Sequence, residues 1–213
     1  MAGVSFQIKN AEKLRKDLEA LQTNGKKAIS ATVKDLKSRA PAWIAQEVVN
    51  AYNIKKSEIT PSKSGGKRAG SIKIAGETIE SLTFTYSGRL LTPVHFGMSP
   101  KSPPAGKKYT IKATILKGQK KTIGKYLTTR TRGGPYSGRS HNILMSTGST
   151  TEGGTPYIPF QRMSKDRKDI KKFTTVSVPQ MVGNKQVGEA IIGRLNEEAT
   201  KRLEHNVERF MNK

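Results

Sequence analysis

Cysteine is absent from this chain of 213 residues, which excludes both a disulfide framework and a thiolate metal site. Aromatic residues make up only 6% of the sequence, so any hydrophobic core must be thin. No apolar run approaches the length that a bilayer-spanning helix needs. Residues 1–9 also lack the apolar segment of a signal peptide. We therefore expect a protein that is made in the cytoplasm and has no membrane partner.

Acidic residues are scarce, and they are scarcest in the middle of the chain. The formal net charge is +23, from 39 basic and 16 acidic side chains. Residues 1–60 carry a net charge of +5, residues 173–213 carry +1, and residues 61–172 carry +17. No Asp or Glu lies between Glu80 and Glu152. This pattern predicts a central cationic surface that attracts a polyanion, either nucleic acid or the acidic face of a protein.

The basic side chains of this acid-free stretch are the candidates for contact with DNA or with an acidic partner. They are Arg89, Lys101, Lys107, Lys108, Lys112, Lys117, Lys120, Lys121, Lys125, Arg130, Arg132 and Arg139. Tyr109, Tyr126 and Tyr136 are interleaved with them, which permits base stacking. No aromatic–basic RNA-binding motif, helix-turn-helix motif or zinc module accompanies them. The sequence thus indicates non-specific binding and leaves the kind of polyanion open.

The last forty residues carry the most regular pattern in the chain. After a turn at Gly183-Asn184, apolar residues recur at spacings typical of one long helix over about 185–211. The positions of this stripe are Val187, Ile191, Leu195, Ala199, Leu203, Val207 and Phe210. Because so long a stripe is not left in water, we expect another part of the chain, or a neighbouring molecule, to cover it.

Further helices are predicted in the N-terminal part and strands in the centre. One helix is expected to end at Asn24-Gly25, and a second to run over about 26–52 with a kink at Pro41; two helices divided at Pro41 are the alternative. A short helical turn is expected near 53–60. Residues 82–86 and 90–96 are predicted to form a β-hairpin. Further strands are predicted at residues 71–75, 109–116, 122–128, 157–163 and 173–178.

Together these elements predict an α+β fold, with a small antiparallel sheet and long basic loops between the helices. We expect a single domain over 1–213, with a helical part (1–60), a basic β and loop part (61–178) and the C-terminal helix (179–213). Within the basic part, residues 129–156 form a long Gly- and Ser-rich segment. Segments of this kind are usually functional or disordered.

Catalytic chemistry finds little support in the sequence. His95, His141 and His205 lie on a predicted strand, a loop and a helix, and none has a second ligand at metal-binding spacing. The Gly65-Gly66-Lys67-Arg68 run lacks the first glycine and the Ser/Thr of a phosphate-binding loop. Asp166 and Asp169 sit among basic residues, as in a solvated turn. We expect no enzymatic activity, no cofactor, no metal and no small-molecule ligand.

Two C-terminal motifs resemble a known family. Residues 177–184 (SVPQMVGN) and 202–209 (RLEHNVER) are similar to the C-terminal signature of the minor tail protein Z, or tail-completion, family of tailed bacteriophages. Weaker similarity precedes these two motifs in the chain, in the order expected for the family, at Ala40-Pro41 and at residues 52–59, 94–104 and 157–162. The resemblance covers most of the chain, and its specific part is the C-terminal third.

This resemblance implies a virion structural protein that acts late in tail assembly and in joining the tail to the head. It would lie in the neck, at the head-proximal end of the tail, as a homo-oligomeric ring for which six copies are one option. The implied partners are its own copies, the tail terminator or tail tube, the head–tail connector and genomic DNA in the lumen. The signature residues implied at the oligomer or partner interface are Pro179, Gln180, Met181, Arg202 and His205. A nucleic-acid-binding protein of another kind is the alternative.

Overall fold

The computed structural model describes residues 22–60, 70–104, 109–125, 143–146, 156–162 and 169–211. The chain divides into two compact units. The helical unit comprises Met1–Asn50, Lys56–Arg89 and Ser177–Lys213, and the cationic unit comprises Ala51–Lys55 and Leu90–Val176. In the full sequence the helical unit has 21 basic and 13 acidic residues, net +8, whereas the cationic unit has 18 and 3, net +15. The predicted α+β class is confirmed, while the prediction of a single domain stays a prediction.

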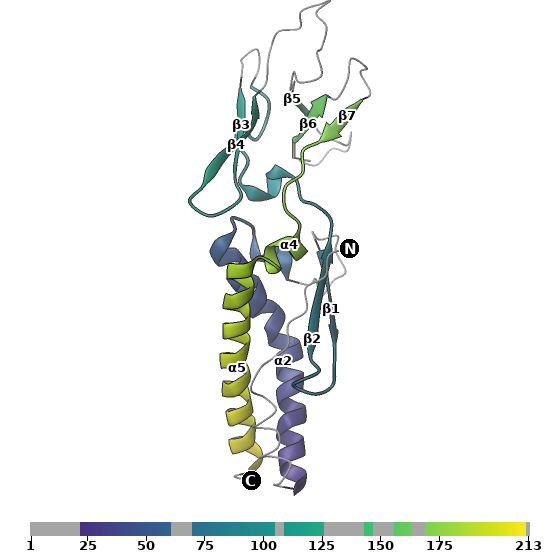
Figure 1. The fold of residues 1–213 in the computed structure, drawn as a ribbon, viewed down its shortest axis with the longest axis vertical. Helices are drawn as coiled ribbons and strands as arrows, with labels where there is room; N and C mark the ends of the chain where they lie inside the picture. Colours follow the sequence, from purple (N-terminus) through teal and green to yellow (C-terminus); the bar gives the residue numbers. More distant parts are fainter. Residues whose placement is uncertain are drawn as a thin grey trace, which may run out of the picture. The chain divides into compact units, whose positions relative to one another are not determined.

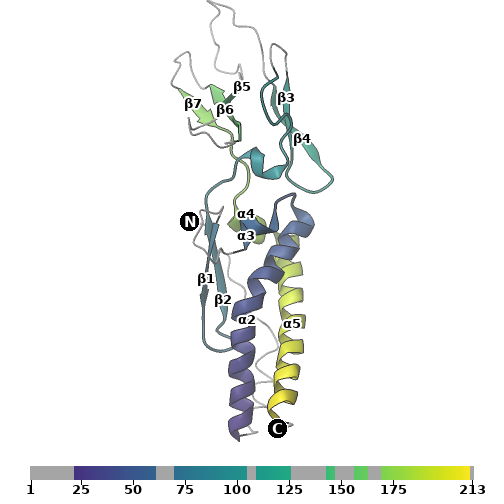
Figure 2. The ribbon, with the colours of Figure 1, turned by 180° about the vertical axis from the view of Figure 1, so that it is seen from behind.

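Helix α2 (Gln22–Ala51) is one continuous helix with Pro41 inside it. This confirms the long helix across the proline. The ribbon of α2 changes direction in the half that leads to α3 (Lys56–Ile59), as Figure 2 shows. The expected helix end at Asn24-Gly25 is wrong, because α2 runs through both residues. Gly25 is buried, and we attribute the continuous helix to packing that outweighs the cost of about 1 kcal/mol for a helical glycine. The helix expected to precede α2 lies outside the described residues.

The C-terminal signature forms two helices, α4 (Val178–Val182) and α5 (Lys185–Met211). A capping box begins α4: the Gln180 backbone N–H donates to Ser177 Oγ at 3.4 Å, and the Ser177 N–H donates to Gln180 Oε1 at 2.9 Å. Asn184 caps α5, because its Oδ1 accepts from the backbone N–H groups of Gln186 and Val187. The predicted turn and the predicted long helix are both confirmed.

Helices α2 and α5 lie side by side and antiparallel (Figures 1 and 2). The predicted stripe of α5 is buried from Val187 to Leu203, but Val207 is only half-buried. Asn206 takes the next buried position, at 1% exposure. Its Nδ2 donates to Thr32 Oγ1 at 3.1 Å and lies 3.4 Å from Asp35 Oδ2, both on α2. Because a buried amide loses this partner if the helices slide, the contact favours one register of the pair.

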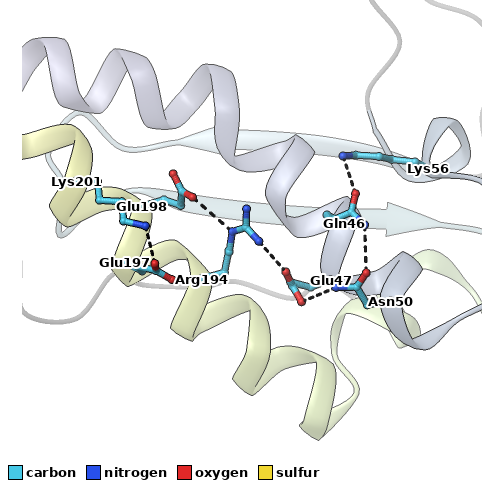
Figure 3. Close-up of polar contacts among 8 residues, drawn as sticks. All are labelled: Gln46, Glu47, Asn50, Lys56, Arg194, Glu197, Glu198 and Lys201. Carbon is cyan, nitrogen blue, oxygen red and sulfur yellow. Dashed lines mark hydrogen bonds and ion pairs between the residues drawn. The ribbon is translucent and has the colours of Figure 1, made fainter. Parts of the chain in front are cut away.

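A row of polar contacts joins α3 (Lys56–Ile59) to α2 and α2 to α5 (Figure 3). Lys56 donates to Gln46, Gln46 donates to Asn50, and Asn50 donates to Glu47, each at 3.1 Å. Glu47 also accepts from Arg194 of α5 at 3.5 Å. Glu47 is therefore the acceptor on which the contacts from α3 and α5 converge.

The helical unit also contains an antiparallel pair of strands, β1 (Gly70–Ala75) and β2 (Thr83–Gly88). The predicted strand at 71–75 is confirmed, whereas the predicted hairpin of 82–86 with 90–96 is wrong. Strand β2 pairs with β1, which precedes it in the chain, and not with the residues that follow it. Residues Pro93–Phe96 form the 3-10 helix η1. Pro93 has no N–H to donate to a ladder, and Leu91 instead exchanges backbone hydrogen bonds with Thr175 and Val176.

Tyr86 of β2 provides a first test of packing in the helical unit. The residue is 1% exposed, its hydroxyl has no hydrogen-bond partner among the described residues, and burial raises the pKa of its phenol. An unpaired buried hydroxyl costs about 1–3 kcal/mol of desolvation. We therefore expect Tyr86→Phe to raise the free energy of unfolding by about 1 kcal/mol in urea denaturation. A lower midpoint in the variant would mean that the hydroxyl is satisfied in solution.

In the cationic unit, β3 (Thr110–Thr114) pairs with β4 (Lys120–Lys125), and β5 (Ile143–Ser146), β6 (Ile158–Arg162) and β7 (Ile170–Lys172) form a second sheet in that order. The strands predicted at 109–116, 122–128 and 157–163 are thus confirmed in their described parts. The strand predicted at 173–178 is wrong: β7 ends at Lys172, and Val178 begins α4. Most of segment 129–156 lies outside the described residues.

Candidate polyanion-binding surface

The β3–β4 hairpin is the best-described part of the cationic unit. Ile111 and Ala113 of β3 are fully buried and alternate with the exposed Lys112, as expected of a strand with one face on a core. The turn needs Gly118, whose φ of +74° is left-handed. Met98 and Ile111 form the core beneath, and partly buried side chains from β4, β5 and the segments flanking β3 and β7 pack on them.

Among the hairpin residues whose side chains are described, four lysines are exposed: Lys112, Lys117, Lys120 and Lys121. Lys112 pairs with Thr122, and Thr114 pairs with Lys120. Lys112 and Lys120 therefore lie diagonally on one face of the ribbon, about 7–8 Å apart in antiparallel geometry. Lys121, the next residue of β4, belongs to the opposite face. The hairpin thus presents positive charge on its open face and at its turn, and through the exposed Lys121 on the side whose Ala113 is buried in the core.

Two other segments of the cationic unit hold this hairpin in place. Ser99 and Lys112 exchange backbone hydrogen bonds of 2.8 and 2.9 Å, so that residue 99 lies beside β3. Next to the turn, the Lys117 N–H donates to Ala51 O and the Asn53 N–H donates to Ile115 O, both at 2.9 Å. The lysines therefore stand on a backbone that is fixed at the middle of β3 and again just beyond its C-terminal end.

The hairpin has no acidic counterpart within the described part of the cationic unit. Asp169 is the one acidic residue described there, and it is exposed. None of the ion pairs among the described residues involves a lysine of the hairpin; those given by the structure lie in the helical unit, where Arg194 contacts Glu47 and Glu198. Since no described carboxylate pairs with them, the four lysines can meet an external anion without first breaking an ion pair within that part of the chain.

The predicted cationic residues fall into three groups. Lys101, Lys112, Lys117, Lys120, Lys121 and Lys125 come together in the cationic unit. Arg89 is exposed just after β2 in the helical unit, so it does not share that unit. Lys107, Lys108, Arg130, Arg132 and Arg139 lie outside the described residues.

Three exposed lysines of the same unit were not among the residues predicted from the sequence. Lys55 follows the segment that is bonded to the hairpin turn, and Lys171 and Lys172 lie on β7. Lys55 comes from a charge-mixed part of the sequence, and only the long-range bond from Asn53 to Ile115 reveals its place. Lys171 and Lys172 could have been found, because the basic excess of the centre continues through them.

The signature residues expected at an interface have mixed exposure. Pro179 and Met181 are buried in the helical unit, and Gln180 is exposed with its side chain in the capping box. Arg202 is half-buried and its Nε has no partner among the described residues, while His205 is exposed. The motif at 177–184 thus has a role inside the fold, as the start of α4. The interface assignment stays a prediction.

The histidines and carboxylates form no metal-binding cluster within the described residues. His95 lies on η1 instead of the expected strand, and His141 is outside the described residues. No described helix is long and apolar enough to cross a bilayer. Comparison with family models, with curated proteins and with solved structures finds no match to this chain, so the resemblance to the tail-completion family stays a prediction.

Proposed function

We propose that this protein is a non-enzymatic structural component of a tailed bacteriophage particle, acting in tail completion and head–tail joining at the neck. The C-terminal signature is the observation that carries the proposal. Its two motifs lie on the consecutive helices α4 and α5. A ring subunit needs a rigid frame and a surface that contacts its neighbours or the lumen. The packed pair α2 and α5 supplies such a frame, with Asn206 favouring its register.

The separation of charge between the two units supports the same function. The helical unit is charge-mixed, and its acids engage its own bases through contacts such as Arg194–Glu47 and Lys201–Glu197. The cationic unit has an uncompensated net charge of +15. In a neck, such a surface would contact either the phosphates of the genome or an acidic neighbouring ring.

Quantitative mass spectrometry of purified particles of the encoding phage tests this proposal. We expect the chain at a fixed, small ratio to the portal protein, as a ring at a symmetric joint requires. Particles made without the chain should accumulate as separate heads and tails. Absence of the chain from mature particles would contradict the proposal. It would favour the second candidate, a non-specific nucleic-acid-binding protein of the infected cell, which the segregated lysines also support.

A further inference from the structure

The exposed basic residues of the β3–β4 hairpin are all lysines. Protein–protein interfaces are depleted in lysine and enriched in arginine, methionine and aromatic residues. Phosphate backbones, in contrast, are contacted by lysine as a point charge that needs no fixed bidentate geometry. The hairpin has neither an arginine nor an aromatic residue from Thr110 to Lys125. This composition fits a phosphate-bearing partner better than the acidic face of a folded protein.

The shape of the hairpin further limits the class of partner that it fits. A two-stranded ribbon is one of the two elements that the major groove of B-DNA admits. One face of the ribbon packs on the core, and its open face carries Lys112 and Lys120. Lys121 shares the core-facing side with the buried Ala113 but is itself exposed, and Lys117 is exposed at the turn. A flat anionic membrane would meet one face only, although Leu116 at the turn is 36% exposed and could enter lipid.

We infer that the β3–β4 hairpin binds the phosphate backbone of double-stranded nucleic acid without reading its sequence. Lys112, Lys117, Lys120 and Lys121 make the contacts, and the bonds from Ser99, Ala51 and Asn53 hold the ribbon that carries them. This inference rests on the proposed function and names the partner of its cationic surface. From Thr110 to Lys125 the hairpin has no Arg, Asn, Asp or Glu to read base edges, and its one Gln lies in the turn.

Fluorescence anisotropy of a labelled mixed-sequence DNA duplex, titrated with the full chain over a range of NaCl concentrations, tests this inference. Each phosphate contact contributes about −0.9 to the slope of log affinity against log salt concentration. The fourfold variant Lys112→Gln, Lys117→Gln, Lys120→Gln, Lys121→Gln should therefore have a slope that is shallower by about 3 to 4. Duplexes of different sequence should bind the wild-type chain equally.

A matched control removes the same charge from the helical unit. Lys26, Lys27, Lys34 and Lys185 are all exposed, and their fourfold change to Gln should leave the slope within about 1 of wild type. Equal losses in the two variants would mean that net charge alone drives binding, and would overturn the assignment to the hairpin. Tighter binding of the wild type to polyglutamate, or to vesicles rich in phosphatidylserine, would overturn the choice of nucleic acid.

The two proposals fail in different ways. If the chain is present in particles at a ring-like ratio but the hairpin variant keeps the wild-type salt slope, the inference falls and the proposed function stands. If the chain is absent from particles but the hairpin variant has the shallower salt slope that we expect, the proposed function falls. The assignment of DNA binding to the hairpin then still holds for the free protein.

Discussion

Leu203→Ala is expected to lower the free energy of unfolding of the helical unit by about 2–5 kcal/mol. Leu203 lies on α5 at 3% exposure, in the stripe that faces the rest of the unit. Removing its branched end loses apolar burial and leaves a cavity that the two long helices can only partly close. Urea denaturation followed by the fluorescence of Trp43, the one tryptophan of the chain, measures the loss in this unit because Trp43 lies on α2.

Val207→Ala is the matched comparison, because the sequence pattern gives Leu203 and Val207 equivalent positions. In the structure Val207 is only half-buried and Asn206 is buried beside α2. We therefore expect Val207→Ala to cost clearly less than Leu203→Ala, about 1 kcal/mol. Equal losses at the two positions would show that the stripe continues in register to the end of α5 and that Asn206 does not replace it.

Local patterns in the sequence predicted the helices well. The spacing from Val187 to Leu203, the turn at Gly183-Asn184 and the continuity of α2 across Pro41 all depend on neighbours within a few turns. The failed strand predictions involve partners far away in the chain. Nothing within residues 82–96 indicates that β2 pairs with the preceding strand β1, or that the backbone of Leu91 is hydrogen-bonded to Thr175. Short apolar runs of this kind fit several pairings equally well.

The candidate surface shows the same division between local and distant information. Its charge could be predicted, because the absence of acids between Glu80 and Glu152 is a property of the sequence alone. The backbone contacts that hold the surface could not be predicted, because those of Ser99 with Lys112 and of Asn53 with Ile115 join residues that are 13 and 62 positions apart. The buried amide of Asn206 was also missed, because a polar residue beside an apolar stripe looks like a surface position.

Gly76→Ala is expected to destabilise the helical unit by about 3 kcal/mol or more. Gly76 directly follows β1 and has a φ of +97°, a conformation that costs a residue with a side chain about 1–3 kcal/mol. A Cβ at this position would also lie 2.2 Å from the backbone oxygen of Ser81. Backbone cannot rotate away as a side chain can, so the connection between β1 and β2 must shift and carry Leu82 and Phe84, both fully buried, with it.

Gly193→Ala supplies the control for that result, because the same methyl group enters the same unit without strain. Gly193 lies inside α5, is exposed, and has no atom near the position of an added Cβ. Replacing an exposed glycine inside a helix by alanine stabilises by about 0.5–1 kcal/mol, chiefly through the entropy of the unfolded chain. We therefore expect the two variants to move the urea midpoint in opposite directions. A Gly76→Ala variant as stable as wild type would mean that the connection from β1 to β2 relaxes freely, and that the buried positions of Leu82 and Phe84 do not depend on it.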